Sequence, residues 1–147
     1  MASQRILCPV DFSSHSKVAV RYASCLAKSL DAKIYFVHVA EIVPAFDIGY
    51  SGGVPSVADL DSDEQELLQV KPSVPGLEYE HFSMVGHPAE TILEFAKTHD
   101  INMIVMGTHG RTGVLRLVMG SVAEMVVRHA DCPVLTVKQP TNVRVCP

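Results

Sequence analysis

Hydrophobic residues along the chain follow two alternating patterns. Short, nearly continuous apolar runs are typical of strands that are buried on both faces. Such runs predict five strands, over residues 5–10, 33–39, 77–85, 101–106 and 133–138. Between the strands, apolar residues recur every three or four positions, as in helices that bury one face. These stretches predict helices over residues 13–31, 58–70, 88–96 and 120–130. The alternation indicates an α/β fold with a parallel, doubly wound, five-stranded sheet.

Local signals refine the predicted boundaries. Pro9 belongs at the carboxyl end of the first strand, because proline donates no bond to a sheet ladder. Ser13 or Ser14 fits the N-cap of the first helix, and Pro88 fits the first turn of the third. From Glu41 to about Val57, prolines and glycines interrupt both patterns. This segment is predicted to be a long loop, a feature that is usually functional or mobile.

In two predicted helices, the apolar residues at helical spacing mark the buried face. They are Ala19, Tyr22, Ala23, Leu26 and Leu30 in the first helix and Ala89, Ile92, Leu93 and Ala96 in the third.

Length, composition and charge restrict the class of protein. A chain of 147 residues, 48% of them hydrophobic, is typical of one domain with a full core. The net charge of −4 argues against nucleic acid as a partner. No apolar run approaches the roughly 20 residues that span a membrane, and the start of the chain leads into a strand. We expect a soluble, cytoplasmic protein that binds neither nucleic acid nor membrane.

The four cysteines, Cys8, Cys25, Cys132 and Cys146, include no Cys-x-x-Cys pair. Their spacing indicates small buried residues plus one thiol near the C-terminus. It predicts neither a zinc site nor a disulfide framework.

The segment after the fourth predicted strand carries the strongest chemical signal. Gly107-Thr108-His109-Gly110 is followed, nine residues later, by Gly120-Ser121 at the start of a helix. Glycines allow close backbone approach, and a helix N-terminus offers unpaired N–H groups with a positive dipole end. This pattern favours a phosphate site and hence a nucleotide ligand. It is neither a Walker A loop nor Gly-x-Gly-x-x-Gly. A glycine-rich turn that only allows tight strand-to-helix packing is the alternative.

Asp11 is the second candidate, because it directly follows the first predicted strand. Ligands of doubly wound sheets bind beyond the carboxyl ends of the strands, where the strand order reverses. If the first and fourth strands are neighbours there, Asp11 and Gly107 face one crevice. The alternative role of Asp11 is that of a turn or helix-start residue.

Nearly the whole chain resembles the universal stress proteins. The resemblance includes residues 6–13, 37–39, 86–90 and 132–137. Its most specific part is the family's ATP-binding signature, Gly-x2-Gly-x9-Gly-Ser/Thr, which Gly107, Gly110, Gly120 and Ser121 match without a gap. The resemblance implies a Rossmann-like fold of the adenine nucleotide alpha hydrolase type, with strand order 3-2-1-4-5. Some branches of the family lack these glycines, and this chain is similar to the branch that binds ATP.

The resemblance also implies a set of nucleotide contacts. Asp11 would accept hydrogen bonds from the ribose hydroxyls. The residues implied to lie against the nucleoside are Pro9, Val10, the Val39 backbone, Met106 and Gly107. Those implied to hold phosphate oxygens are Gly110, Gly120, Ser121 and the Val122 amide.

Three residues near these contacts have open roles. Arg111 reaches phosphate or is simply solvated. His109 either helps to orient phosphate or, as we expect, is a surface residue. His38 lies in a predicted buried strand without metal-ligand spacing.

Together with the glycine loop, the resemblance implies an ATP-binding stress-response protein in which the nucleotide is a bound effector. ADP or AMP would fit the same site, and Mg²⁺ would be an additional component. The first alternative is a slow ATP hydrolase, which needs a placed base near the γ-phosphate. Glu124 is one turn into the following helix, and no second carboxylate or lysine is evident there. The second alternative, a chaperone-like module that needs no nucleotide, leaves the glycine signature unexplained.

The fifth predicted strand is a candidate interface. In the order 3-2-1-4-5 it is an edge strand, and residues 133–137 carry no charge that would protect it from pairing. We therefore expect a homodimer joined along this strand about a two-fold axis. Alternatively, residues 139–147 fold back over the edge and keep the protein monomeric.

Overall fold

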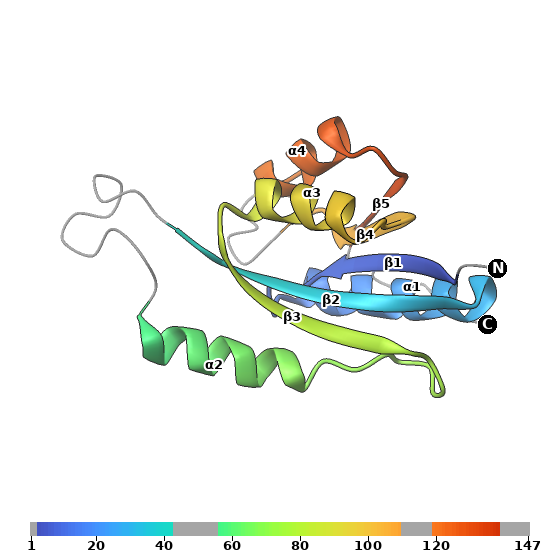
Figure 1. Cartoon of the computed structure of the whole chain (residues 1–147), viewed down its shortest axis with the longest axis horizontal. Helices are drawn as coiled ribbons and strands as arrows, with labels where there is room; N and C mark the ends of the chain where they lie inside the picture. The colour runs from blue at the N-terminus through green and yellow to red at the C-terminus, as the bar shows by residue number, and fades with distance from the viewer. Residues whose placement is uncertain (1–2, 43–55, 110–118, 139–147) are drawn as a thin grey trace.

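The computed structural model describes residues 3–42, 56–109 and 119–138. In these residues strands and helices alternate in the predicted order (Figure 1). The strands are β1 Gln4–Pro9, β2 Ala32–Glu41, β3 Tyr79–Gly86, β4 Met103–Gly107 and β5 Val134–Val137. The helices are α1 Ser14–Leu30, α2 Val57–Leu68, α3 Pro88–Thr98 and α4 Ser121–His129. Most of the predicted loop from Glu41 to Val57 lies outside the described residues.

The sheet is parallel and has the order β3-β2-β1-β4-β5, as predicted. The chain starts in the middle of the sheet at β1, moves to one edge through β2 and β3, and then returns to the other side of β1 with β4. The strand order therefore reverses between β1 and β4, which are paired through Ile6–Met103 and Leu7–Ile104. A ligand crevice is expected at the carboxyl ends of these two strands.

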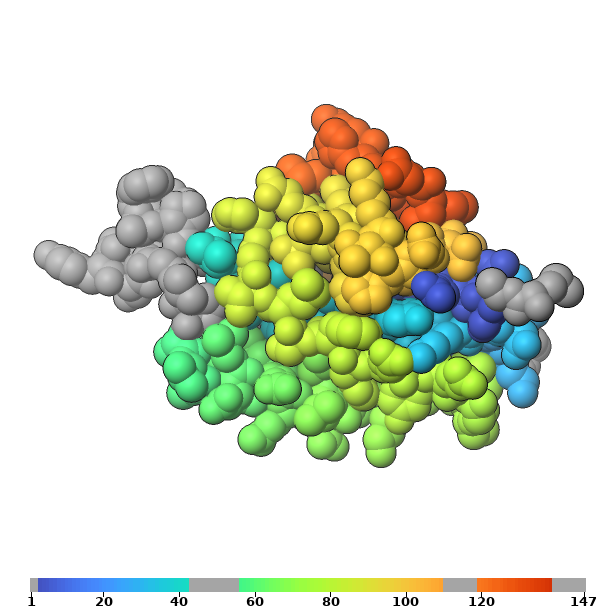
Figure 2. All heavy atoms as spheres, viewed as in Figure 1, coloured from blue at the N-terminus to red at the C-terminus, as the bar shows by residue number. Residues whose placement is uncertain are grey.

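Two apolar clusters cover the two faces of the sheet. Side chains of α1 pack with Ile6, Cys8 and Phe36 on one face, together with Leu67 of α2. Side chains of α3 and α4 pack with Leu7 and Val37 on the other. In the space-filling view, α2 and β3 form one flank of the molecule and α4 the opposite one, with α3 between them (Figure 2).

The predicted buried faces are correct for most positions. Ala19, Ala23, Ala89 and Ile92 are buried, but Leu30 in the last turn of α1 is 45% exposed. Helical spacing extends the apolar stripe to Leu30, but the next residue, Asp31, already turns the chain with a φ of 52°. Phe95 of α3 is also buried, although it was not among the predicted core positions. Its ring packs edge-on against that of Phe82 on β3, with ring centroids 4.9 Å apart.

The helix starts match their sequence signals. Ser13 is the N-cap of α1, and its hydroxyl accepts a hydrogen bond from the Ser16 amide. Pro88 lies in the first turn of α3, where the missing N–H leaves no acceptor unpaired. No helix of the described residues is long and apolar enough to span a membrane.

The cysteines differ from their prediction in one respect. Cys8 and Cys132 are free thiols, and Cys8 is buried. Cys25 is disulfide-bonded, which its spacing did not indicate, because a single bridge leaves no repeated pattern in a sequence. Cys146 lies outside the described residues.

Candidate functional site

A cavity of about 420 Å³ opens at the carboxyl ends of β1, β2 and β4. Its volume lies within the range of small-molecule sites, about 300–1,000 Å³. Every predicted site residue that the structure describes lines this cavity: Pro9, Val10, Asp11, Val39, Met106, Gly107, Gly120, Ser121 and Val122. Gly110 and Arg111 lie outside the described residues. The fold thus brings together residues up to 113 positions apart, from Pro9 to Val122.

Asp11 shapes the turn from β1 into α1. Its Oδ1 accepts hydrogen bonds from the Ser13 amide at 3.0 Å and from the Ser13 hydroxyl at 2.5 Å. Its own amide donates to the Ser16 hydroxyl at 3.2 Å. The turn role that the sequence left open is therefore real, and the same carboxylate also lines the cavity. One side chain fixes the turn and faces the space for a ligand.

The residue after Asp11 has an unusual backbone. Phe12 has a φ of 66°, in the left-handed region that side chains other than glycine rarely adopt. Such a conformation costs about 1–2 kcal/mol. It persists where surrounding contacts fix it, and the Phe12 ring packs on the His38 ring with centroids 4.5 Å apart.

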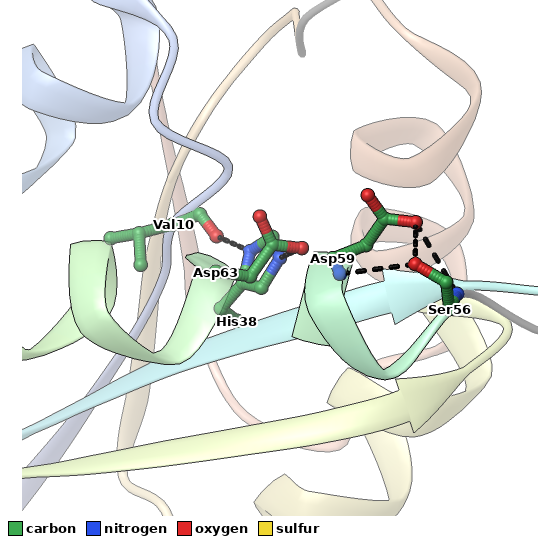
Figure 3. A network of polar contacts seen from close by, with 5 residues as sticks. All are labelled: Val10, His38, Ser56, Asp59 and Asp63. Carbon is green, nitrogen blue, oxygen red and sulfur yellow. Dashed lines mark hydrogen bonds and ion pairs between the residues drawn. The ribbon is translucent and has the colours of Figure 1, made fainter. Parts of the chain in front are cut away.

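His38 bridges two walls of the cavity (Figure 3). Its Nδ1 lies 2.8 Å from the Val10 carbonyl oxygen, and its Nε2 lies 3.2 Å from Asp63 Oδ2 on α2. The residue is 5% exposed. The apolar pattern predicts His38 in a buried strand but indicates no partner for its ring. The sequence holds no local signal for this contact, because Asp63 follows 25 residues later on a separate helix.

The backbone of Val39 faces the cavity. On β2, Val37 faces β1, because its carbonyl accepts a hydrogen bond from the Val10 amide at 2.8 Å. Val39, two residues later, faces the same way, since alternate residues of a strand bond to opposite neighbours. β1 ends at Pro9, and the Val10 carbonyl pairs with His38. The Val39 N–H and C=O therefore lie beyond the end of the β1 ladder.

The N-terminus of α4 forms another wall. Its N-cap, Gly120, supplies no side-chain cap, and the Gly120 amide donates to the Thr108 carbonyl at 2.6 Å. Helix geometry leaves the amides of Ser121, Val122 and Ala123 without an intrahelical acceptor. All three residues line the cavity. This wall can therefore hold an anion through backbone donors and the helix dipole.

The signature glycines also serve packing. A Cβ on Gly107 would lie 2.9 Å from His15 Cβ and 3.2 Å from the His15 carbonyl carbon. Glycine at this position lets the end of β4 approach the start of α1. A Cβ on Gly120 would lie 3.1 Å from the Thr108 carbonyl oxygen. The packing role that the sequence left open is therefore present at Gly107 and, more weakly, at Gly120.

His109 is not the surface residue that the sequence suggested. It is partly buried, with Nδ1 3.0 Å from the Thr108 hydroxyl and its ring 5.3 Å from that of His15. Its Nε2 is buried and has no hydrogen-bond partner in the part of the chain that the structure describes. His109 lines the cavity. A buried polar atom in this position is available to a bound molecule.

Charged groups of two kinds line the cavity. Carboxylates come from the turn after β1 (Asp11), from β2 (Glu41) and from α2 (Asp59 and Asp63), and the positive dipole end comes from α4. Glu124, in the first turn of α4, pairs with Arg128 at 2.9 Å and is not among the lining residues. Among the described residues, no group of three or more potential metal ligands comes together. The cavity lining thus combines carboxylates with the N-terminus of a helix that can bind an anion.

The sequence model of the universal stress protein family matches residues 2–138. The chain belongs to this family. A universal stress protein of Methanocaldococcus jannaschii is 36% identical over 141 residues, which cover 93% of this chain and 83% of the relative.

Solved structures of universal stress proteins share the fold. One from Lactobacillus plantarum is 28% identical with a TM-score of 0.71, and the match covers 93% of this chain and 99% of that one. Another, from Archaeoglobus fulgidus in complex with dAMP, is 23% identical with a TM-score of 0.66 and covers 92% and 97%. A third, in complex with cAMP, is 23% identical with a TM-score of 0.61 and covers 94% and 98%.

Proposed function

We propose that this universal stress protein binds an adenine nucleotide in the cavity between β1, β2 and β4 and acts as a nucleotide-dependent stress-response module. The observation that carries the proposal is the pairing of the Val39 backbone at one wall with the N-terminus of α4 at another. The first offers one donor and one acceptor, and the second offers several donors to an anion. A nucleoside phosphate has the complementary groups.

The Val39 backbone supports adenine as the base. Adenine presents a ring-nitrogen acceptor beside an exocyclic amino donor, which match an N–H and a C=O on one residue. Guanine presents two acceptors, N7 and O6, on its corresponding edge. One guanine acceptor would then face the Val39 carbonyl oxygen, which is also an acceptor, and neither atom would have a donor. We therefore expect a clear preference for adenine over guanine.

The α4 end of the cavity supports phosphate. The amides of Ser121 and Val122 are oriented as in other helix-terminal anion sites. His109 adds a further group, because its Nε2 carries the proton when the Thr108 hydroxyl donates to Nδ1. The Nε2–H would then donate a hydrogen bond to a phosphate oxygen. ATP, ADP and AMP all offer such oxygens, and Mg²⁺ would arrive on the phosphate chain.

The Asp11 carboxylate supports the ribose. Asp11 lines the cavity next to Val10, and a carboxylate is a suitable acceptor for hydroxyl groups. The A. fulgidus relative binds dAMP and another family structure holds cAMP, so related proteins accept adenine nucleotides with different sugars and phosphates.

We further propose that the nucleotide is an effector and that turnover is very slow. Hydrolysis needs a group that orients water or accepts its proton at the terminal phosphate. Glu124 is held by Arg128, and both nitrogens of His38 have partners. Asp11 Oδ1 is engaged by Ser13. These assignments leave binding as the activity that the described residues support best.

We also propose that the protein is a homodimer joined along β5. β5 is an edge strand of the described sheet, and Leu135 on it is 37% exposed. Met125 and Val127 of the adjacent α4 are 43% and 45% exposed. Antiparallel pairing of two β5 strands would satisfy the edge backbone and cover apolar surface. The alternative cover, residues 139–147, lies outside the described residues.

A Val39→Pro variant tests the adenine contact. Proline removes the N–H that faces the cavity, whereas the hydrogen bonds towards β3 come from alternate residues, such as Ile34 of β2 and Ile42 just after its end. We expect AMP affinity to fall by about tenfold or more, the loss of one buried hydrogen bond. Val39→Ile, which keeps the N–H, is the control. Unchanged AMP affinity in a folded Val39→Pro protein, measured by calorimetry, would refute the assignment.

A further inference from the structure

His38 has two hydrogen-bond partners that are both acceptors. Val10 presents a backbone carbonyl oxygen to Nδ1, and Asp63 presents a carboxylate oxygen to Nε2 (Figure 3). A neutral imidazole carries only one N–H and can satisfy only one of them. An imidazolium carries two N–H groups and satisfies both. The arrangement therefore fits a protonated His38 facing an ionised Asp63.

The contact lies where α2 has little else to hold it. Leu67 is the buried residue of α2 and joins the core near the C-terminal end of the helix. Beyond that end, the Val70 carbonyl lies 2.7 Å from His81 Nε2, and the Ser73 amide donates to Ser24. Asp63 is one turn closer to the N-terminus and pairs with His38. Among the described contacts, this hydrogen bond is the polar attachment of the N-terminal part of α2.

We propose that His38 is a positioning residue that holds α2 against the cavity in its imidazolium form, so that loss of its proton releases the N-terminal part of α2. The Val10 carbonyl, the Val39 backbone and Asp63 all belong to the cavity wall. The proposed attachment of α2 rests only on the two contacts of the His38 ring. Its effect on nucleotide affinity rests on the proposed function.

The direction of the pH effect follows from the charges. Histidine titrates near neutral pH in general, whereas carboxylates are ionised well below it. The imidazolium makes both bonds, and the neutral ring keeps one N–H. The shorter contact, from Nδ1 to the Val10 carbonyl at 2.8 Å, favours the Nδ1–H tautomer, in which Nε2 presents a lone pair to the Asp63 carboxylate. The contact to Asp63 is therefore lost when the imidazolium is deprotonated as pH rises. Other titratable groups line the same cavity: Asp11 on the turn after β1, Glu41 on β2, Asp59 on α2 and His109 after β4. Asp59 is bound to Ser56 within its own helix cap, and Phe12, uncharged, packs on the His38 ring.

Asp63→Asn separates a charge-dependent contact from a merely structural one. An asparagine amide can donate to Nε2 of a neutral His38, whose Nδ1–H still bonds to Val10. This variant should keep α2 attached at high pH, where the wild type releases it. Asp61→Asn removes an exposed carboxylate from the same helix and is the matched control. His38→Gln should hold α2 weakly at every pH.

The test is amide hydrogen exchange of the nucleotide-free protein between about pH 6 and pH 8.5, expressed as protection factors, with side-chain ¹⁵N shifts reporting the protonation of His38. In the wild type and Asp61→Asn, we expect protection of residues 61–66 to fall about tenfold with rising pH relative to α1, the size expected for one charge-assisted hydrogen bond. In Asp63→Asn it should stay level. A flat wild-type profile, an equal fall in Asp63→Asn, or a neutral His38 at pH 6 would overturn the proposal.

A parallel titration with AMP connects the contact to binding. Ionisation of the AMP phosphate is common to all variants and cancels in the ratio of their affinities. We expect the wild type to lose more affinity than Asp63→Asn as pH rises. If α2 responds to pH as expected but AMP does not bind at any pH, the proposed function fails and the α2 contact stands. Equal pH profiles for AMP in both proteins would overturn the coupling of the contact to the cavity.

Discussion

Replacing Gly107 with alanine tests whether this glycine is needed for packing between β4 and α1, in addition to its place in the nucleotide-binding signature. The new Cβ would lie 2.9 Å from His15 Cβ and 3.2 Å from both the carbon and the oxygen of the His15 carbonyl. Neither the backbone of α1 nor a Cβ can rotate away, so β4 and α1 must separate. Overpacking of this kind costs about 1–3 kcal/mol. For a chain of this size, that corresponds to a Tm decrease of about 3–10 °C.

Gly120→Ala is the natural comparison. Its Cβ would have one close contact, the Thr108 carbonyl oxygen at 3.1 Å, and Gly120 has a φ of −62° that any residue can adopt. Alanine is a poorer N-cap than glycine, so we expect a loss of about 1 kcal/mol or less. Nucleotide affinity should nevertheless fall, because Gly120 lines the cavity beside the α4 amides.

Thermal and urea unfolding of both variants, followed by circular dichroism without nucleotide, checks this order. The expected result is a larger stability loss for Gly107→Ala than for Gly120→Ala. A Gly107→Ala protein with the Tm of the wild type would show that β4 and α1 adjust freely. The packing explanation for Gly107 would then be wrong.

Three further results are expected. ATP turnover should be far below the roughly 10 per second that is typical of enzymes, and rapid phosphate release lost in Ser121→Ala would instead favour a hydrolase. Light scattering should show a dimer, and Thr136→Pro should weaken it without changing the far-UV spectrum. Pro133 and Val137 bond to β4, so the Thr136 N–H faces the open edge of the sheet. Leu135→Pro, which removes a hydrogen-bond donor to β4, should unfold the protein, and a monomeric wild type would contradict the interface. Burial raises the pKa of the Cys8 thiol far above its usual range. At neutral pH, Cys8 should therefore react with a thiol reagent only on unfolding, whereas the partly exposed Cys132 should react before it. Equal reaction rates of Cys8 and Cys132 in the native protein would contradict this.

The alternation of apolar runs and helical spacing was sufficient to predict the sheet and its helices. Boundaries moved by up to two residues at several ends; β2, for example, extends to Glu41. The strand order came from the family resemblance, because periodicity alone does not say which strands are neighbours. Leu30 was misplaced because spacing carries no information about where a helix leaves the core.

Some residues of the candidate site could likewise be predicted from the sequence, and others could not. Residues next to strand ends, such as Asp11 and Gly107, could be found because parallel strands bring their carboxyl ends together. The contact between His38 and Asp63 could not be found, since it depends on how α2 packs after a long connection. The packing role of Gly107 required the distance to His15, which no sequence pattern encodes. The buried Nε2 of His109 depends on its Thr108 partner and the neighbouring ring of His15.

The most direct test of nucleotide binding is isothermal titration calorimetry of nucleotide-free protein with AMP, ADP and ATP, and with GMP as the matched competitor. We expect saturable binding of the adenine nucleotides at one site per chain. We also expect the affinity for GMP to be lower by about tenfold or more, because one guanine acceptor would face the Val39 carbonyl. Absence of binding by all three adenine nucleotides would refute the proposed nucleotide site, and equal affinity for AMP and GMP would refute the proposed adenine contact.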